Sequence, residues 1–165
     1  MFKKGYRMQR VFLRILKLVF KVHFLFLSFH AVALAQDLES ITPVGFWKTI
    51  DDVTGEPKAI VEIQDIDGSF KGIIRKTFSK PGDKSTCELC PGDKKDKPIV
   101  DMEILWGLKK DGNEYVGGEI LDPKNGKTYK AKLELIEQGK KLKVRGFIGF
   151  SLIGRTQVWH RADKL

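Results

Sequence analysis

The sequence predicts an all-β protein in which eight antiparallel strands follow one another up and down and close into a barrel. Three observations support this prediction. From residue 36 onward, apolar and polar residues alternate with a period of two in short runs. Gly, Asp, Asn and Pro separate these runs at hairpin spacing, and no run shows a helical stripe. Closure would hide both edges of the sheet; a two-sheet sandwich is the alternative.

The first four strands are expected at Gly45–Ile50, Lys58–Ile66, Ser69–Phe78 and Ile99–Leu108. In the second strand, Ala59, Val61 and Ile63 share one face. Asp67-Gly68 is a hairpin turn that leads into the third strand. The fourth is the next apolar run along the chain.

The last four strands are expected at Glu114–Leu121, Thr128–Ile136, Lys141–Phe147 and Arg155–Arg161. The turn between the first two of these is the strongest hairpin signal in the chain. Pro123 presets one φ angle, and Asn125-Gly126 accepts positive φ without strain. The following strand alternates cleanly, and Gln138-Gly139 turns the chain into the next one.

The charge is concentrated at the N-terminus. Residues 1–35 hold seven of the 30 basic side chains and none of the 21 acidic ones, so that residues 36–165 carry about +2 of the net +9. A protein that binds nucleic acid needs a concentrated positive surface. The nearly neutral body therefore argues against a nucleic-acid partner.

Residues 1–35 have the three parts of a signal peptide. A basic segment, residues 1–21, precedes an apolar one at residues 22–32, and Ala33-Leu34-Ala35 fits the small-x-small cleavage rule. Cleavage would leave a single domain, residues 36–165, that begins at Gln36. Met8 is an alternative start. A membrane span needs about 20 apolar residues, and lysines interrupt this run. We therefore expect export to the periplasm or the medium, with no span in the mature chain.

Residues 79–98 interrupt the strand pattern with a long polar loop that contains Cys87 and Cys90. A Cys-x-x-Cys pair can act in redox chemistry, but that chemistry normally needs a helix N-terminus near a βαβ unit. Zinc needs four ligands, and a second cysteine pair is missing. In an oxidising compartment we expect a disulfide bond that staples the loop.

Three motifs together resemble a known family. They are Gly45-Phe46-Trp47, Gly118-x-Ile120-x-Asp122-Pro123-x-x-Gly126-Lys127-x-Tyr129 and Gly146-x-x-Gly149-x-x-x-x-Gly154-Arg155-Thr156-Gln157-x-Trp159-x-Arg161. They resemble the bacterial secreted proteins grouped as domain of unknown function 2147. The resemblance covers nearly all of the mature chain and implies a lipocalin-like barrel of the calycin type, but it implies no activity.

The Gly45-x-Trp47 opening is also similar to that of lipocalins. There the first-strand tryptophan packs at the closed end of the barrel, and a basic residue from the last strand lies across it. The resemblance makes Arg155 and Arg161 the candidates. A guanidinium over an indole is a cation–π contact worth about 0.5–2 kcal/mol.

The residues give no sign of catalysis. His160 is the only histidine after residue 35, and its pairing with Ser151 would be arbitrary because no recognisable triad or Gly-x-Ser-x-Gly motif is present. Asp65-Ile66-Asp67-Gly68 lacks the remaining ligands of a calcium loop and is interpreted as a turn. We therefore expect a non-enzymatic protein without a cofactor or a metal.

An eight-stranded barrel is just wide enough to be filled by side chains or to hold one small ligand. The residues expected to line such a cavity are Trp47, Phe70, Trp106, Tyr129, Trp159, Arg155 and Arg161. Aromatic lining with a few polar groups favours a small apolar or amphipathic ligand. The alternative is a filled core in an envelope-structural or protein-interaction module. The sequence leaves this choice and the oligomeric state open.

Overall fold

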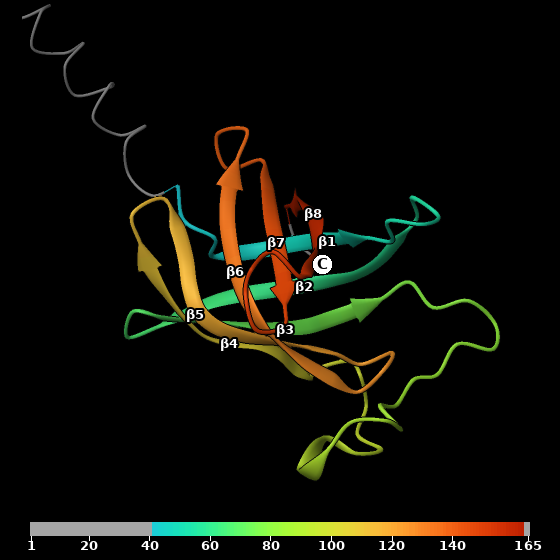
Figure 1. Ribbon diagram of the computed structural model, residues 1–165. Coiled ribbons are helices and arrows are strands. Elements are labelled where there is room, and N and C mark those ends of the chain that lie inside the picture. Colours follow the sequence, from blue (N-terminus) through green and yellow to red (C-terminus); the bar gives the residue numbers. More distant parts are fainter. Residues whose placement is uncertain (1–40, 164–165) are drawn as a thin grey trace, which may run out of the picture. The chain divides into compact units, whose positions relative to one another are not determined.

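The computed structural model describes residues 41–163. Eight strands form a closed antiparallel barrel in which each pairs with its neighbours in sequence and β8 pairs with β1 (Figure 1). They are β1 Gly45–Ile50, β2 Pro57–Ile66, β3 Ser69–Thr77, β4 Glu103–Asp111, β5 Glu114–Asp122, β6 Lys127–Ile136, β7 Lys141–Phe147 and β8 Gly154–Ala162. The predicted barrel is confirmed, and the sandwich is excluded. The predicted signal peptide and its cleavage before Gln36 lie outside the described residues.

The fourth strand is the clearest departure from the sequence prediction. It was expected at Ile99–Leu108, but β4 begins at Glu103. Ile99 donates its backbone N–H to Ser85 at 2.9 Å, inside the preceding loop, instead of pairing with β3. The segment before β4 contains apolar residues because some of them, such as Met102, are buried beneath that loop. At the other end, Asp111 pairs with Glu114 and extends the β4–β5 hairpin beyond the apolar run.

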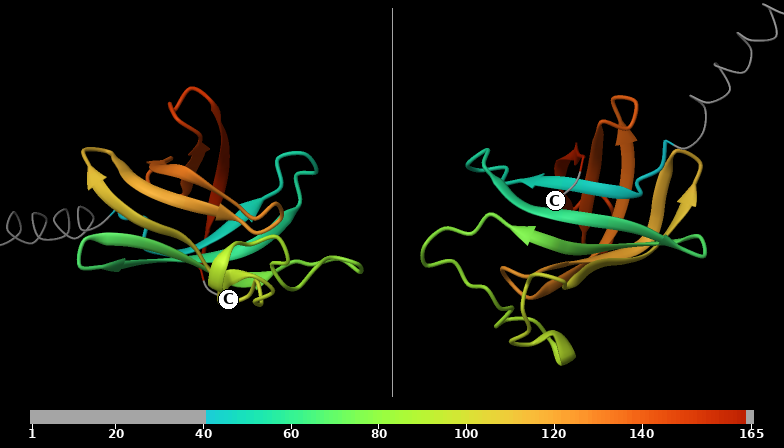
Figure 2. Two further views of the ribbon diagram at one scale, coloured as in Figure 1. Left: turned by 60° about the horizontal axis from the view of Figure 1, so that its bottom comes forward. Right: turned by 180° about the vertical axis from the view of Figure 1, so that it is seen from behind.

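The up-and-down order gives the barrel two ends. At the closed end lie residues 41–44 and the short turns after β2, β4 and β6. At the open end lie the connections 51–56, 78–102, 123–126 and 148–153. The connection between β3 and β4 is the longest and lies outside the barrel (Figure 2, yellow-green); it contains one short 3₁₀ helix, η1 Gly92–Lys94. No helix in residues 41–163 is long and apolar enough to cross a membrane.

Side chains fill the half of the barrel near the closed end. Trp47, Ile63, Leu108, Leu133 and Leu142 have no water-accessible surface. A void large enough for a water molecule would expose the side chains that border it, so none adjoins these residues. Close packing of this kind is typical of protein interiors. Each such side chain contributes about 1.5–3 kcal/mol by its removal from water.

Arg161 seals the closed end. Its guanidinium carbon lies 4.2 Å from the centre of the Trp47 ring. Its nitrogens donate to the carbonyl oxygens of Gly139 at 2.6 Å, Val44 at 3.0 Å and Thr42 at 2.8 Å. Partial burial lowers the pKa of Arg161 from its usual value. One side chain thus joins β8, the β6–β7 turn and the segment before β1.

The sequence offered two arginines for this position, and the strand pairing selects one. Trp47 pairs with Arg161 across the β1–β8 ladder. Arg155 also faces inward, because it pairs with Gly146 opposite Ala131, but it lies at the other end of β8. Arg155 and Arg161 are six positions apart on one strand, so alternation places both on the inner face and cannot tell which of them contacts Trp47.

Candidate functional site at the open end of the barrel

At the open end, the inward-facing side chains become accessible. The strand register points Ile120, Tyr129, Gly146 and Gln157 into the barrel, on the same face as buried residues such as Leu133. All four are partly exposed, in contrast to the inward-facing residues of the closed half. The barrel therefore has a filled half and an open end at which water reaches the inward-facing side chains; we call these four residues the vestibule.

Trp159 lies two residues beyond Gln157 along β8, nearer to the closed end. Its indole is almost fully buried, and the ring N–H donates to the side-chain oxygen of Gln157 at 3.2 Å. On the neighbouring strand, the hydroxyl of Thr49 accepts a hydrogen bond from the backbone N–H of Ala59 at 3.1 Å. The polar groups at this depth are thus oriented by partners within the barrel.

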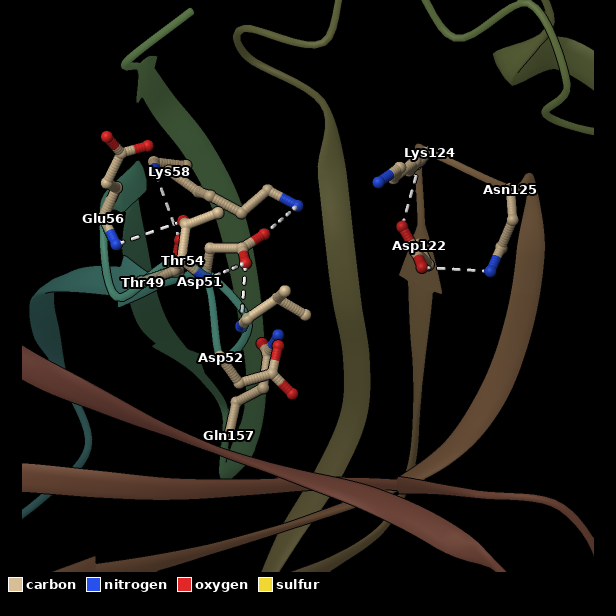
Figure 3. Close-up of polar contacts among 12 residues, drawn as sticks. Thr49, Asp51, Asp52, Thr54, Glu56, Lys58, Asp122, Lys124, Asn125 and Gln157 are labelled. Carbon is tan, nitrogen blue, oxygen red and sulfur yellow. Dashed lines mark hydrogen bonds and ion pairs between the residues drawn. The ribbon is translucent and has the colours of Figure 1, made fainter.

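The connection between β1 and β2 forms one side of the rim (Figure 3). The Asp51 carboxylate accepts from the backbone N–H groups of Thr54 at 3.0 Å and Val53 at 2.9 Å. These bonds, with Lys58 at 3.6 Å, lower the pKa of Asp51 to about 2. The next residue, Asp52, forms an ion pair with Arg155.

The hairpin between β5 and β6 carries a second polar group of the rim (Figure 3). Asp122 accepts from the backbone N–H of Lys124 at 2.9 Å and from the Asn125 side chain at 3.0 Å. The Asn125 amide also donates to the hydroxyl of Tyr129 at 3.1 Å. A hairpin turn was predicted at this position, and its hydrogen bonds also orient Tyr129, the one aromatic candidate that is partly exposed in the vestibule.

The long loop packs outside the barrel. Cys87 and Cys90 form the expected disulfide bond, and both are buried. The loop lies against the β5–β6 hairpin at Gly126, where φ is +68° and a Cβ atom would collide with the backbone of Leu89. Only glycine satisfies both conditions. The loop therefore packs against the barrel in a defined position, held by the disulfide bond and by the close contact between Gly126 and the backbone of Leu89.

Trp106 was expected to line the barrel, and the structure contradicts this. It pairs with Glu119 on the outer face, and the Lys94 ammonium lies 4.3 Å from its ring centre. The cause is a β-bulge. Leu105 pairs with Gly72 and Leu108 pairs with Phe70, so β4 advances three positions where β3 advances two, and both leucines face inward. Trp106 was proposed as lining because it is aromatic; only alternation counted back from Leu108 would place it inside, and the bulge breaks that count.

The other candidates divide between the core and the rim. Trp47, Phe70 and Trp159 are buried, and Phe70 meets Tyr115 edge to face with ring centres 4.7 Å apart. These three are packing residues of the filled half. Tyr129 and Arg155 lie at the open end, whereas Arg161 lies at the closed end. The structure therefore brings together only part of the predicted lining.

Ser151 and His160 do not meet. Ser151 lies in the connection before β8, and His160 lies on the exposed face of β8 near the opposite end, paired with Lys48 and Lys141. Asp65 forms the expected turn, because it accepts the backbone N–H of Gly68 at 2.8 Å. Neither sequence-level candidate for catalysis or calcium binding gains support from its surroundings.

Two features of the open end were missed by the sequence analysis. One is Asp52, whose partner Arg155 lies far away in sequence. The other is the connection 148–153, whose apolar residues are exposed. Two hollows, of about 340 and 610 Å³, lie on the outer surface and are lined mainly by charged residues. Neither belongs to the vestibule.

The comparisons with known proteins agree with this architecture. A family model described as "Uncharacterized protein conserved in bacteria (DUF2147)" matches residues 45–161. Among solved structures, the chain resembles one described as "Protein HP1028 from the human pathogen Helicobacter pylori belongs to the lipocalin family". The identity is 20%, the TM-score is 0.65, and the match covers 75% of this chain and 85% of that one. This likeness shows the fold alone.

Among curated protein sequences, none matches this chain significantly. The family match begins at the first residue of β1 and ends at Arg161, the residue that seals the barrel. The chain therefore belongs to the DUF2147 family of uncharacterized bacterial proteins, and its fold is a lipocalin-like barrel.

Proposed function

We propose that this protein binds a small amphipathic molecule in the vestibule and does so without catalysis. The observation that carries the proposal is the contrast within the barrel: inward-facing side chains are accessible at the open end and fully enclosed at the other. A small-molecule site is usually concave and mostly apolar, with a few oriented polar groups. Ile120 and Tyr129 supply the apolar wall, and Gln157 supplies the polar group.

The filled half limits the kind of ligand. Trp159, Leu133 and Leu142 are buried in that half, so that a long acyl chain has no room to descend along the barrel axis. The ion pair between Asp52 and Arg155 provides charges of both signs at the rim. We therefore infer a short apolar group directed toward Trp159 and a polar group held at the rim.

The absence of catalysis is part of the proposal. The rim carboxylates already have local partners: Asp51 and Asp122 accept backbone N–H groups of their own turns, and Asp52 is paired with Arg155. His160 lies near the closed end, on the outer face of β8. These placements support binding in preference to acid–base chemistry at the vestibule.

Native mass spectrometry of protein purified from its own cells tests the proposal. We expect a fraction of the molecules to carry a bound small molecule. Gly146→Val should abolish that fraction. A Cβ atom at this position would lie 3.4–3.5 Å from Ile120 and Tyr129, which is ordinary contact, so the variant can fold. The two methyl groups beyond the Cβ would enter the vestibule and occupy the space of the ligand.

Thr128→Val is the matched control, because Thr128 is exposed and pairs with Leu121 on the outer face of β6. It should retain the ligand. Protein that is always free of ligand, or equal loss of ligand in both variants, would refute the proposal.

Export is the second part of the proposal. The basic and apolar composition of residues 1–35, together with the Cys87–Cys90 disulfide, supports secretion through a cleaved signal peptide. The test is the N-terminal sequence of the protein recovered from the periplasm or the medium. Processing before Gln36 is expected; recovery of the uncleaved chain from the cytoplasm would contradict it.

The alternative is an interaction module with a filled core. The observation in its favour is the long loop, which is docked, stapled and projected from the barrel (Figure 1). Deletion of residues 79–98 should remove a protein partner under this alternative and leave ligand binding under the first proposal.

A further inference from the structure

The connection between β7 and β8, residues 148–153, is an exposed apolar tip. The segment from Phe147 to Gly154 contains no charged residue. Ile148, Phe150, Leu152 and Ile153 are 63%, 82%, 90% and 71% exposed. Figure 2 (left) shows this connection, in red, projecting beyond the strands that it joins. Soluble proteins rarely expose several large apolar side chains together unless the patch binds something.

The tip is held in one conformation. The backbone N–H of Ile148 donates to Ile153 at 3.1 Å, and that of Ile153 donates to Phe150 at 3.1 Å. Arg145 donates to the carbonyl oxygens of Ser151, at 2.7 Å from its Nε atom, and Leu152, at 3.3 Å. A preformed tip loses little conformational entropy when it binds.

Arg145 also lowers the energetic cost of placing the tip in an apolar medium. Backbone carbonyl groups without partners are strongly disfavoured in a hydrocarbon environment. The guanidinium supplies donors to the two carbonyl groups at the tip, and it donates to the Thr156 hydroxyl at 2.8 Å as well. Within residues 41–163, Arg145 forms no ion pair with a carboxylate, so its guanidinium has no paired counter-charge there.

These features select a lipid surface as the partner. The side chains project from a convex tip, which suits a deformable medium, whereas a protein partner would need a matching socket. An uncharged tip above the Arg145 guanidinium complements the acyl chains and the phosphate groups of a phospholipid layer.

We propose that the β7–β8 connection inserts Phe150 and Leu152 into the surface of a phospholipid bilayer, with Arg145 at the level of the phosphate groups. The tip lies at the open end, so docking brings the vestibule to the lipid. This lipid contact depends on the exposed apolar side chains of the tip and on the hydrogen bonds from Arg145 to its backbone. It does not depend on whether the vestibule binds a ligand.

Flotation with phosphatidylglycerol and phosphatidylcholine vesicles tests the proposal. The chain is used as its own cells produce it, so that any contribution from residues 1–35 is common to all variants. We expect wild type to float with phosphatidylglycerol vesicles. The double variant Phe150→Ser/Leu152→Ser should bind at least tenfold more weakly.

The matched control is Val53→Ser/Leu89→Ser, which removes two side chains of similar exposure, 87% and 65%, from other connections of the open end. It should change vesicle affinity less than twofold. Equal losses in both double variants, or no flotation of wild type, would overturn the proposal. So would sedimentation data in which the tip variant abolishes self-association and leaves flotation unchanged.

A fluorescent reporter gives a direct readout of insertion. Phe150→Trp should show a blue shift with vesicles and quenching by brominated acyl chains, whereas Val53→Trp should show neither. Unchanged emission from both would overturn the proposal. Gly146→Val should leave flotation intact, which distinguishes failure of the ligand site from failure of the lipid contact.

Discussion

Replacement of Arg161 by alanine is the sharpest test of how the barrel is closed. The variant loses the contact with the Trp47 ring and three hydrogen bonds to carbonyl oxygens. The cation–π contact is worth about 1 kcal/mol. Each hydrogen bond contributes about 0.5–1 kcal/mol, at the lower end of the usual range because water reaches this side chain. We expect the free energy of unfolding to fall by about 2.5–4 kcal/mol.

Urea unfolding followed by tryptophan fluorescence measures this change, because Trp47 and Trp159 are both buried. Arg155→Ala is the matched control: it removes an inward-facing arginine from the other end of the same strand. Its ion pair with Asp52 is exposed, so the expected loss is about 0–1 kcal/mol. A loss from Arg161→Ala no larger than that of the control would show that Arg161 does not hold the closed end together.

Three further predictions concern the loops. Serine at both Cys87 and Cys90 should lower stability by about 2 kcal/mol and raise hydrogen exchange in residues 79–98, with the far-UV circular dichroism of the barrel unchanged. Gly126→Ala should lower the free energy of unfolding, measured in urea, by at least about 2 kcal/mol. The control Gly112→Ala should lower it by about 1 kcal/mol, because φ is positive there too but no atom lies within 4 Å of the added Cβ. Wild type should lose stability as the pH falls from about 4 to 2, because the folded-state pKa of Asp51 is about 2 against 3.8; Asp51→Asn should flatten that dependence in acid titrations.

Local pattern was enough to predict most of the barrel. The run from Thr128 to Ile136 alternates without interruption, and β6 occupies it with one added residue. The Asn125-Gly126 turn forms where the positive φ of glycine was expected. These elements depend on neighbours in sequence, so composition and spacing determine them.

Long-range contacts account for what the sequence analysis missed. Ile99 and Met102 are apolar because a loop packs over them, which mimics the pattern of a buried strand. The β4 bulge next to Gly107 reverses the faces of the residues around it, so Trp106 points outward. Alternation cannot predict a bulge whose position depends on the partner strand.

The site shows the same division. Tyr129 was among the aromatic candidates, and its register on β6 points it into the barrel at the open end. By contrast, the run from Phe147 to Ile153 has the composition of a core segment, and its exposure depends on Arg145, which ties the backbone of the tip to the outer face of β7. No property of the run itself distinguishes an exposed tip from a buried strand.

A crystal structure of the protein purified from its own cells would show whether the open end of the barrel holds a ligand. We expect density for a small molecule there, in contact with Tyr129 and Gln157 and ending above Trp159. An open end that holds only solvent, or density between Trp47 and Leu133 in the filled half, would show that the proposed site is wrong.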